Sequence, residues 1–225
     1  MNQFPLKLDS CHHSPRQPWL LMFLAISSLI QFKAIAMIVH PLLEWVAATT
    51  DLHFLSWAIT FRIPALLWCG GWYLAVAHHG IAQSPKRPVP WRKLGLLTLA
   101  TLSITAVIIF GSSVWIQPVA TVEAALVLVV IAVLVEEYWF RGVVYGVMIN
   151  RFPASPKLAM TVSSVLFSLN HWQYHGFRLT LPALAQIVYT LPLGFVFGYL
   201  RSATGRLWPG ILVHMAINGL AVLRS

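Results

Sequence analysis

Two adjacent glutamates and an arginine lie inside an apolar run, in the segment VEEYWFR at positions 135–141. Each charged group at the depth of a bilayer costs about 2.5–3.5 kcal/mol on insertion scales, so such residues mark either a functional site or a buried ion pair. On a helix, Glu137 and Arg141 are four residues apart and can pair. Glu136 is turned about 100° away around the helix and lacks that partner. A purely structural ion pair would explain Glu137 and Arg141, but it leaves Glu136 for chemistry.

His171, on the next apolar run, is placed to meet Glu136. Glu136 lies 14 residues before the turn at 150–157, and His171 lies 14 residues after it. Because two antiparallel helices joined by a short turn bring equidistant residues to the same depth, we expect the two side chains to approach within reach of one bridging water. Phe167 precedes His171 by four residues and lies on the same helix face. A histidine at the end of a span is otherwise an interfacial residue, and the unpaired glutamate opposite favours the functional interpretation.

The last apolar run carries His214 and Asn218, which are also four residues apart and share one face. Both side chains can donate hydrogen bonds, either to a neighbouring helix or to a developing oxyanion. A glutamate beside a histidine can deprotonate a water that then attacks a peptide carbonyl, and each oxyanion donor contributes about 3–4 kcal/mol in other enzymes. The sequence has no Gly-x-Ser-x-Gly or His-Glu-x-x-His motif. These residues together therefore favour a glutamate-based hydrolysis.

The composition places this site in a membrane. Of the 225 residues, 58% are hydrophobic and 9% are charged, whereas soluble domains carry about 25% charged residues. A span needs about 20 apolar residues, so the chain can hold seven or eight. We expect an all-α, polytopic transmembrane bundle of about seven spans in one domain at 18–225, after a polar, Pro-broken tail at 1–17. The expected spans cover 18–39, 54–79, 94–116, 119–149, 158–171, 183–200 and 207–223.

The runs at 119–149 and 18–39 differ from an ordinary span. The 119–149 run is long for one helix and is expected to be tilted or broken. The first run contains Ala34-Ile35-Ala36, which resembles a signal-peptide cleavage site. Because the run continues to Val39 and contains Lys33, we expect it to be retained as a span. Cys11 and Cys69 lie in the tail and in an apolar run, and we interpret both as free thiols.

The net charge of +9 does not indicate nucleic-acid binding, because most of the 15 Lys and Arg lie in short loops between apolar runs. A cytoplasmic N-terminus puts ten of them inside and only Arg178 and Arg224 outside, with three within spans, as the positive-inside rule requires. The ten expected on the cytoplasmic side are Lys7, Arg16, Lys86, Arg87, Arg92, Lys93, Arg151, Lys157, Arg201 and Arg206. We therefore expect a multi-pass protein of the cell membrane with a lipid-facing surface.

In this order, Glu136-Glu137-x-x-x-Arg141, Phe167-x-x-x-His171 and His214-x-x-x-Asn218 resemble the three motifs of the CPBP family. That family contains the type II CAAX prenyl endopeptidases and bacterial proteins grouped with bacteriocin self-immunity. The resemblance covers about 119–222, and Gly205-Arg206-Leu207-Trp208-Pro209 also looks like the family's entry to the last motif. The stretch WQYH at 172–175 is less typical and bears on substrate specificity.

The resemblance implies a bacterial inner-membrane protease of the glutamic type that needs no metal or other cofactor. Glu136 is implied as the catalytic glutamate acting with His171 on water. Glu137 and Arg141 would support the site, and His214 with Asn218 would serve the oxyanion. The implied partner is a membrane-associated protein or peptide, cleaved near a C-terminal sorting or anchor segment. A prenylated substrate is not implied, and the sequence predicts no particular oligomeric state.

Three alternatives remain at this point. A zinc protease could use His171, His175 and His214 with a glutamate, although Glu136 is already needed beside His171 and Gly176 follows where that span ends. A non-enzymatic binding or immunity protein could keep the same fold and cavity. A small transporter with a proton-relay carboxylate is disfavoured, because the sequence shows no repeats or broken helices of the transporter kind.

Overall fold

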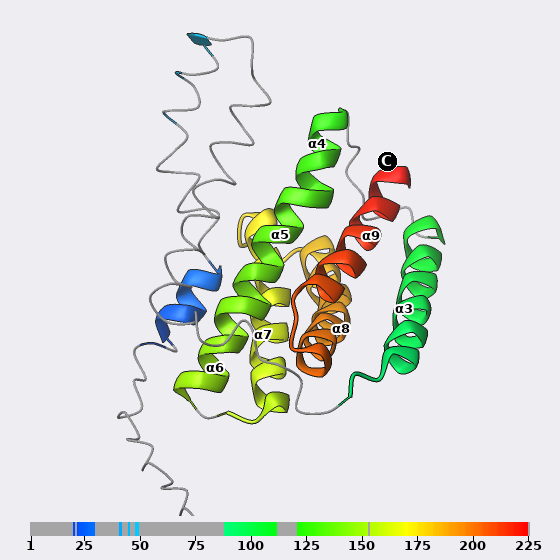
Figure 1. Ribbon diagram of the computed structural model, residues 1–225. Coiled ribbons are helices and arrows are strands. Elements are labelled where there is room, and N and C mark those ends of the chain that lie inside the picture. Colours follow the sequence, from blue (N-terminus) through cyan, green and yellow to red (C-terminus); the bar gives the residue numbers. More distant parts are fainter. Residues whose placement is uncertain are drawn as a thin grey trace, which may run out of the picture.

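The computed structural model describes residues 20, 22–29, 41, 45, 48–49, 88–111, 121–152 and 154–224, and this part of the chain contains helices and no strand. The expected all-α class is therefore confirmed for these residues. The helices are α3 (Trp91–Gly111), α4 (Val122–Leu126), η2 (Val127–Ile131), α5 (Ala132–Glu137), η3 (Tyr138–Val144), α6 (Tyr145–Arg151), α7 (Pro156–Asn170), η4 (His171–His175), α8 (Leu181–Thr204) and α9 (Trp208–Arg224). Figure 1 shows α4, α5 and α6 as one long rod beside α7. Helices α8 and α9 follow, and α3 lies across the bundle from the rod.

Among the described residues, α3 and α8 are long and apolar enough to cross a membrane. The expected runs at 94–116, 158–171, 183–200 and 207–223 correspond to α3, α7, α8 and α9, with ends that differ by a few residues. The structure does not describe the expected run at 54–79, most of the run at 18–39 or the tail at 1–17. Cys11, Lys33, Arg62 and Cys69 therefore lie outside the described residues. The count of seven spans and the orientation of the chain stay predictions.

The run expected at 119–149 forms an uninterrupted helical stretch from α4 to α6 that contains two π-helical segments, η2 and η3. In a π turn an N–H bonds to the carbonyl five residues back. The N–H of Ala132 bonds to the carbonyl of Val127, and the N–H of Tyr145 bonds to that of Phe140. Each shift leaves the carbonyl four residues back without its usual donor. Helices accommodate such turns at specific sites, frequently functional ones.

Side chains from later helices bind these two released carbonyls. The amide of Asn218 donates to the carbonyl of Leu128 at 3.0 Å, and Nε of Arg201 donates to the carbonyl of Arg141 at 3.1 Å. The contact at Arg141 is buried, and a buried backbone carbonyl needs such a partner. The two π segments therefore fasten the long helix to α9 and to α8.

Local capping chemistry starts α7 after the turn that joins it to α6. Ser155 caps α7, because its hydroxyl accepts from the N–H of Leu158 at 3.2 Å, and Pro156 follows in the first turn.

Close packing of α8 on α7 depends on a glycine. A Cβ added at Gly194 of α8 would lie 3.1 Å from the Cβ of Ser164 on α7. The absence of a side chain at that position lets α8 approach α7 closely, as small residues do between membrane helices.

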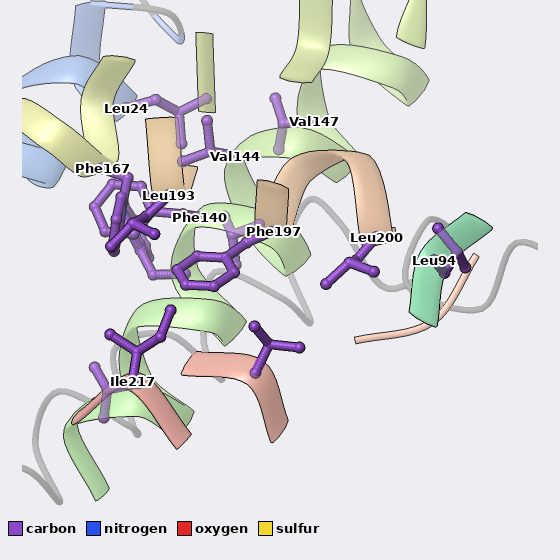
Figure 2. Packing of buried hydrophobic residues seen from close by; sticks show 14 of the residues in the cluster. Leu24, Leu94, Phe140, Val144, Val147, Phe167, Leu193, Phe197, Leu200 and Ile217 are labelled. Carbon is purple, nitrogen blue, oxygen red and sulfur yellow. The ribbon is translucent and has the colours of Figure 1, made fainter. Parts of the chain in front are cut away.

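The core lies where the long helix, α7, α8 and α9 meet. Phe140, Phe167 and Phe197 come from three different elements and gather in its centre (Figure 2). The ring centroids of Phe140 and Phe167 are 5.4 Å apart and those of Phe167 and Phe197 are 6.0 Å apart, both with edge-to-face geometry. This geometry is favoured between aromatic rings. The aromatic centre forms one wall of the polar site.

Candidate active site

The motif residues converge from four elements and are almost completely removed from the surface. Glu136 and Glu137 end α5, Arg141 belongs to η3, His171 begins η4 and His214 lies in α9. The exposed fractions are 5% for Glu136, 0% for Glu137, 1% for Arg141, 8% for His171 and 5% for His214. Such burial of charge is costly unless the groups are paired. The partners of each group therefore indicate what it does.

Glu137 is the anchored carboxylate. Its Oε1 accepts from Nη1 of Arg141 at 3.1 Å and from Nδ1 of His214 at 3.0 Å. The pair predicted from the four-residue spacing is therefore confirmed. The second terminal nitrogen of the guanidinium, Nη2, donates to the carbonyl of Gly194 at 3.1 Å. Phe167 covers the guanidinium, whose central carbon lies 4.2 Å from the centre of that ring.

The approach of α9 to Glu137 depends on a glycine. A Cβ added at Gly210 would lie 3.1 Å from Oε2 of Glu137. A side chain there would push α9 away from the carboxylate, or force the carboxylate to move. Because His214 follows one turn later on α9, Gly210 lets that histidine reach the glutamates.

His214 lies between the two glutamates. While Nδ1 bonds to Glu137, Nε2 is 3.8 Å from Oε2 of Glu136. The second distance is too long for a direct hydrogen bond, although the two groups still attract when the imidazole is protonated. The ring stacks on Phe197, with centroids 4.7 Å apart. Glu137 and Phe197 together set the orientation of the imidazole, much as a carboxylate orients a catalytic histidine in other enzymes.

His171 has one nitrogen engaged by its own helix. Nδ1 lies 2.9 Å from the carbonyl of Phe167, so it carries the hydrogen in this bond and Nε2 is the nitrogen that can accept a proton. The imidazole meets the ring of Phe167 edge-on at 5.0 Å, and His214 meets the same ring at 5.7 Å. The expected shared face of Phe167 and His171 is therefore confirmed, with Phe167 as the common neighbour of both histidines.

Tyr174 is the site residue that the sequence analysis did not identify. Its hydroxyl donates to Oε1 of Glu136 at 3.2 Å, and its ring lies 5.8 Å from that of His171. In a 3₁₀ helix residues three apart eclipse, so η4 places Tyr174 directly next to His171. The only signal in the sequence is the three-residue spacing, which has this meaning only once the helix is known to tighten. Glu136 and His171 thus share Tyr174 as a neighbour, and their approach within reach of one bridging water stays a prediction.

Asn218, expected beside His214 as an oxyanion donor, is half-buried and binds the carbonyl of Leu128. This bond occupies one of its two amide hydrogens. His175, the third histidine of the zinc alternative, is turned to α8, where its Nε2 lies 2.7 Å from Oε1 of Gln186. Within the described ranges, no group of three or more His, Cys, Asp and Glu is arranged to hold a metal ion.

Arg201 differs from expectation. The positive-inside count places it in a cytoplasmic connection, but it lies in the last turn of α8 with only 2% of its surface exposed. Its guanidinium carbon lies 5.6 Å from the centre of the Tyr145 ring, and its Nε binds the carbonyl released in η3. Arg201 therefore holds the backbone of Arg141, which in turn holds Glu137.

A comparison with family models matches residues 118–220 to the family described as type II CAAX prenyl endopeptidase Rce1-like. Comparisons with curated proteins and with solved structures give no match. The matched range contains all three motifs and nearly coincides with the range of the resemblance noted from the sequence, which is thereby confirmed. Residues 118–220 of the chain thus match the type II CAAX prenyl endopeptidase Rce1-like family, a family of membrane proteases.

Proposed function

We propose that the chain is an intramembrane endopeptidase of the glutamic type, in which Glu136 acts with His171 on a water molecule. The observation that carries this proposal is the unequal use of the two glutamates. Oε1 of Glu137 is saturated by Arg141 and His214, whereas Oε2 of Glu136 has His214 as a neighbour at 3.8 Å, beyond hydrogen-bond distance. A base must keep an oxygen available for the proton it removes. Oε2 of Glu137 also lacks a hydrogen-bond partner, but Glu137 is paired with Arg141 and this oxygen is enclosed against Gly210 of α9, which leaves Glu136 as the better placed base.

In the proposed reaction, Oε2 of Glu136 removes a proton from water while the water oxygen attacks the carbonyl carbon of the scissile peptide. Nε2 of His171 accepts a hydrogen bond from the same water and orients it. The proton held by Glu136 then passes to the leaving nitrogen, and the carbon–nitrogen bond breaks. This sequence returns the carboxylate to its starting form and needs no metal.

His214 is the proposed oxyanion donor. With Nδ1–H bonded to Glu137, a protonated Nε2 can point toward the negative charge that develops on the carbonyl oxygen. Asn218 is proposed to assist through the amide hydrogen that does not bind Leu128. Oxyanion donors act mainly in the transition state, so both residues should affect turnover more than substrate binding.

The proposed substrate is a membrane-associated protein or peptide cleaved near its C-terminal end. The description of the matched family makes a prenylated peptide ending in a CAAX sequence the first probe. In one assay, the purified full chain is reconstituted in liposomes with a farnesylated, internally quenched CAAX peptide. In a second assay, the chain is reconstituted with membrane proteins, and mass spectrometry searches these proteins for new C-termini. We expect the wild type to cleave and Glu136→Gln to be inactive but folded.

Three results would contradict the proposal. Full activity in Glu136→Gln would remove the glutamate from the mechanism. Activity that is lost with a strong chelator and returns with zinc would support the metal-dependent alternative instead. A wild type that binds the peptide without cleaving it would favour the non-enzymatic binding protein.

A further inference from the structure

Tyr174 connects the outer surface of the protein to the buried glutamate. Its side chain is 47% exposed, yet its hydroxyl reaches Oε1 of Glu136, a residue that is only 5% exposed. The proposed function gives roles to Glu136, His171, His214 and Asn218 and none to this tyrosine. A phenol that donates to the catalytic carboxylate must affect how that carboxylate is held.

The turn that carries Tyr174 is fastened on both sides of it. The indole nitrogen of Trp172 donates to the carbonyl of Arg178 at 3.1 Å, and His175 is tied to Gln186 on α8 at 2.7 Å. Phe177 has a φ of 59°, in the left-handed region that non-glycine residues rarely adopt. Such backbone strain persists only where the surroundings impose it. The position of the tyrosine is therefore set by the fold of the turn.

The contact divides the two oxygens of the glutamate between two neighbours. Oε1 accepts from the Tyr174 hydroxyl at 3.2 Å, and Oε2 faces Nε2 of His214 at 3.8 Å. The terminal torsion of a glutamate is broad and roughly two-fold, so the carboxylate turns easily unless one oxygen is held. Tyr174 supplies that hold from the side opposite to His214.

We propose that Tyr174 is a positioning residue, whose hydroxyl holds Oε1 of Glu136 so that Oε2 stays directed at the water that Glu136 and His171 activate. This inference rests on the proposed function. Removing the hydroxyl removes a hydrogen bond to a charged group, which corresponds to a loss of about 10-fold to 100-fold in kcat. KM should stay unchanged, because the aromatic ring that faces outward remains in place.

The test compares Tyr174→Phe with Tyr199→Phe, a matched loss of one phenol hydroxyl at a tyrosine of α8 that is 40% exposed. Cleavage of the farnesylated CAAX peptide is measured for the full chain in liposomes, with melting temperatures in detergent. A second readout does not depend on catalysis. Dicyclohexylcarbodiimide adds to carboxyl oxygens in apolar surroundings, and mass spectrometry follows the rate at Glu136, with Glu136→Gln as the blank.

We expect Tyr174→Phe to lower kcat at constant KM and melting temperature, and to raise the labelling rate at Glu136 by about 2-fold to 10-fold, because Oε1 is released. Tyr199→Phe should match the wild type in every measurement. Turnover in Tyr174→Phe equal to that of an active wild type overturns the positioning role and leaves the proposed function intact. A wild type that cleaves neither this peptide nor any co-reconstituted membrane protein overturns the proposed function, and an unchanged labelling rate then overturns the contact as well.

Discussion

The two adjacent glutamates should respond differently to the same substitution. Glu136→Gln and Glu137→Gln each replace one carboxylate oxygen with an amide nitrogen at nearly constant volume. In Glu137→Gln, however, Arg141 loses its charge partner, and a neutral amide oxygen replaces the carboxylate oxygen that Nη1 of Arg141 and Nδ1 of His214 approach at 3.1 Å and 3.0 Å in the native site. Glu136 has one hydrogen bond from Tyr174 at 3.2 Å, which the amide oxygen of a glutamine can still accept.

The size of the difference follows from these partners. Removing one member of a buried ion pair costs about 3–5 kcal/mol, because the remaining charge is left without compensation. Arg141 is only 1% exposed and has no access to water that could replace the carboxylate. For a protein of this size, about 1 kcal/mol shifts the melting temperature by about 2–4 °C, so Glu137→Gln should melt roughly 6–20 °C below the wild type. Glu136→Gln should melt within about 2 °C of it.

The assay measures the melting temperature and the yield of monodisperse protein in detergent, together with peptide cleavage. The double variant Glu137→Gln/Arg141→Gln is the control, because removing both charges of a buried pair costs less than removing one. It should melt above Glu137→Gln and remain inactive. Equal melting temperatures for Glu136→Gln and Glu137→Gln would refute the reasoning, and they would favour an account in which both carboxylates merely hold the helices together.

Two further predictions concern the carbonyls released by the π segments. Arg201→Gln removes the donor to the carbonyl of Arg141 and should lower the free energy of unfolding by about 1–3 kcal/mol, measured by thermal melting. The control is Arg206→Gln, at an exposed neighbouring position, which should leave the melting temperature unchanged. Asn218→Ala removes the donor to Leu128 and should lower stability by about 0.5–1.5 kcal/mol. If Asn218 also serves the oxyanion, kcat falls while KM stays constant; a stability loss with unchanged kcat would limit Asn218 to a structural role.

Local spacing alone predicted several parts of this site. The four-residue separation of Glu137 and Arg141 brings the two charges together on any helix, whatever surrounds it, and their ion pair is present. Phe167 and His171 share a face for the same reason, and their rings are in contact. The apolar runs predicted the helices of the described region because a helix satisfies its backbone within one segment.

Tertiary structure decided the contacts that give each polar group its role. Tyr174 meets Glu136 across 38 positions, Arg201 meets the Arg141 carbonyl across 60, and Asn218 meets the Leu128 carbonyl across 90. The last two contacts exist because π turns release carbonyls, and the first exists because η4 tightens to a 3₁₀ helix. Changes of helical pitch carry little signal in residue type, since they depend on how neighbouring helices pack. The sequence therefore determined which charges were buried, and packing determined which partners each of them meets.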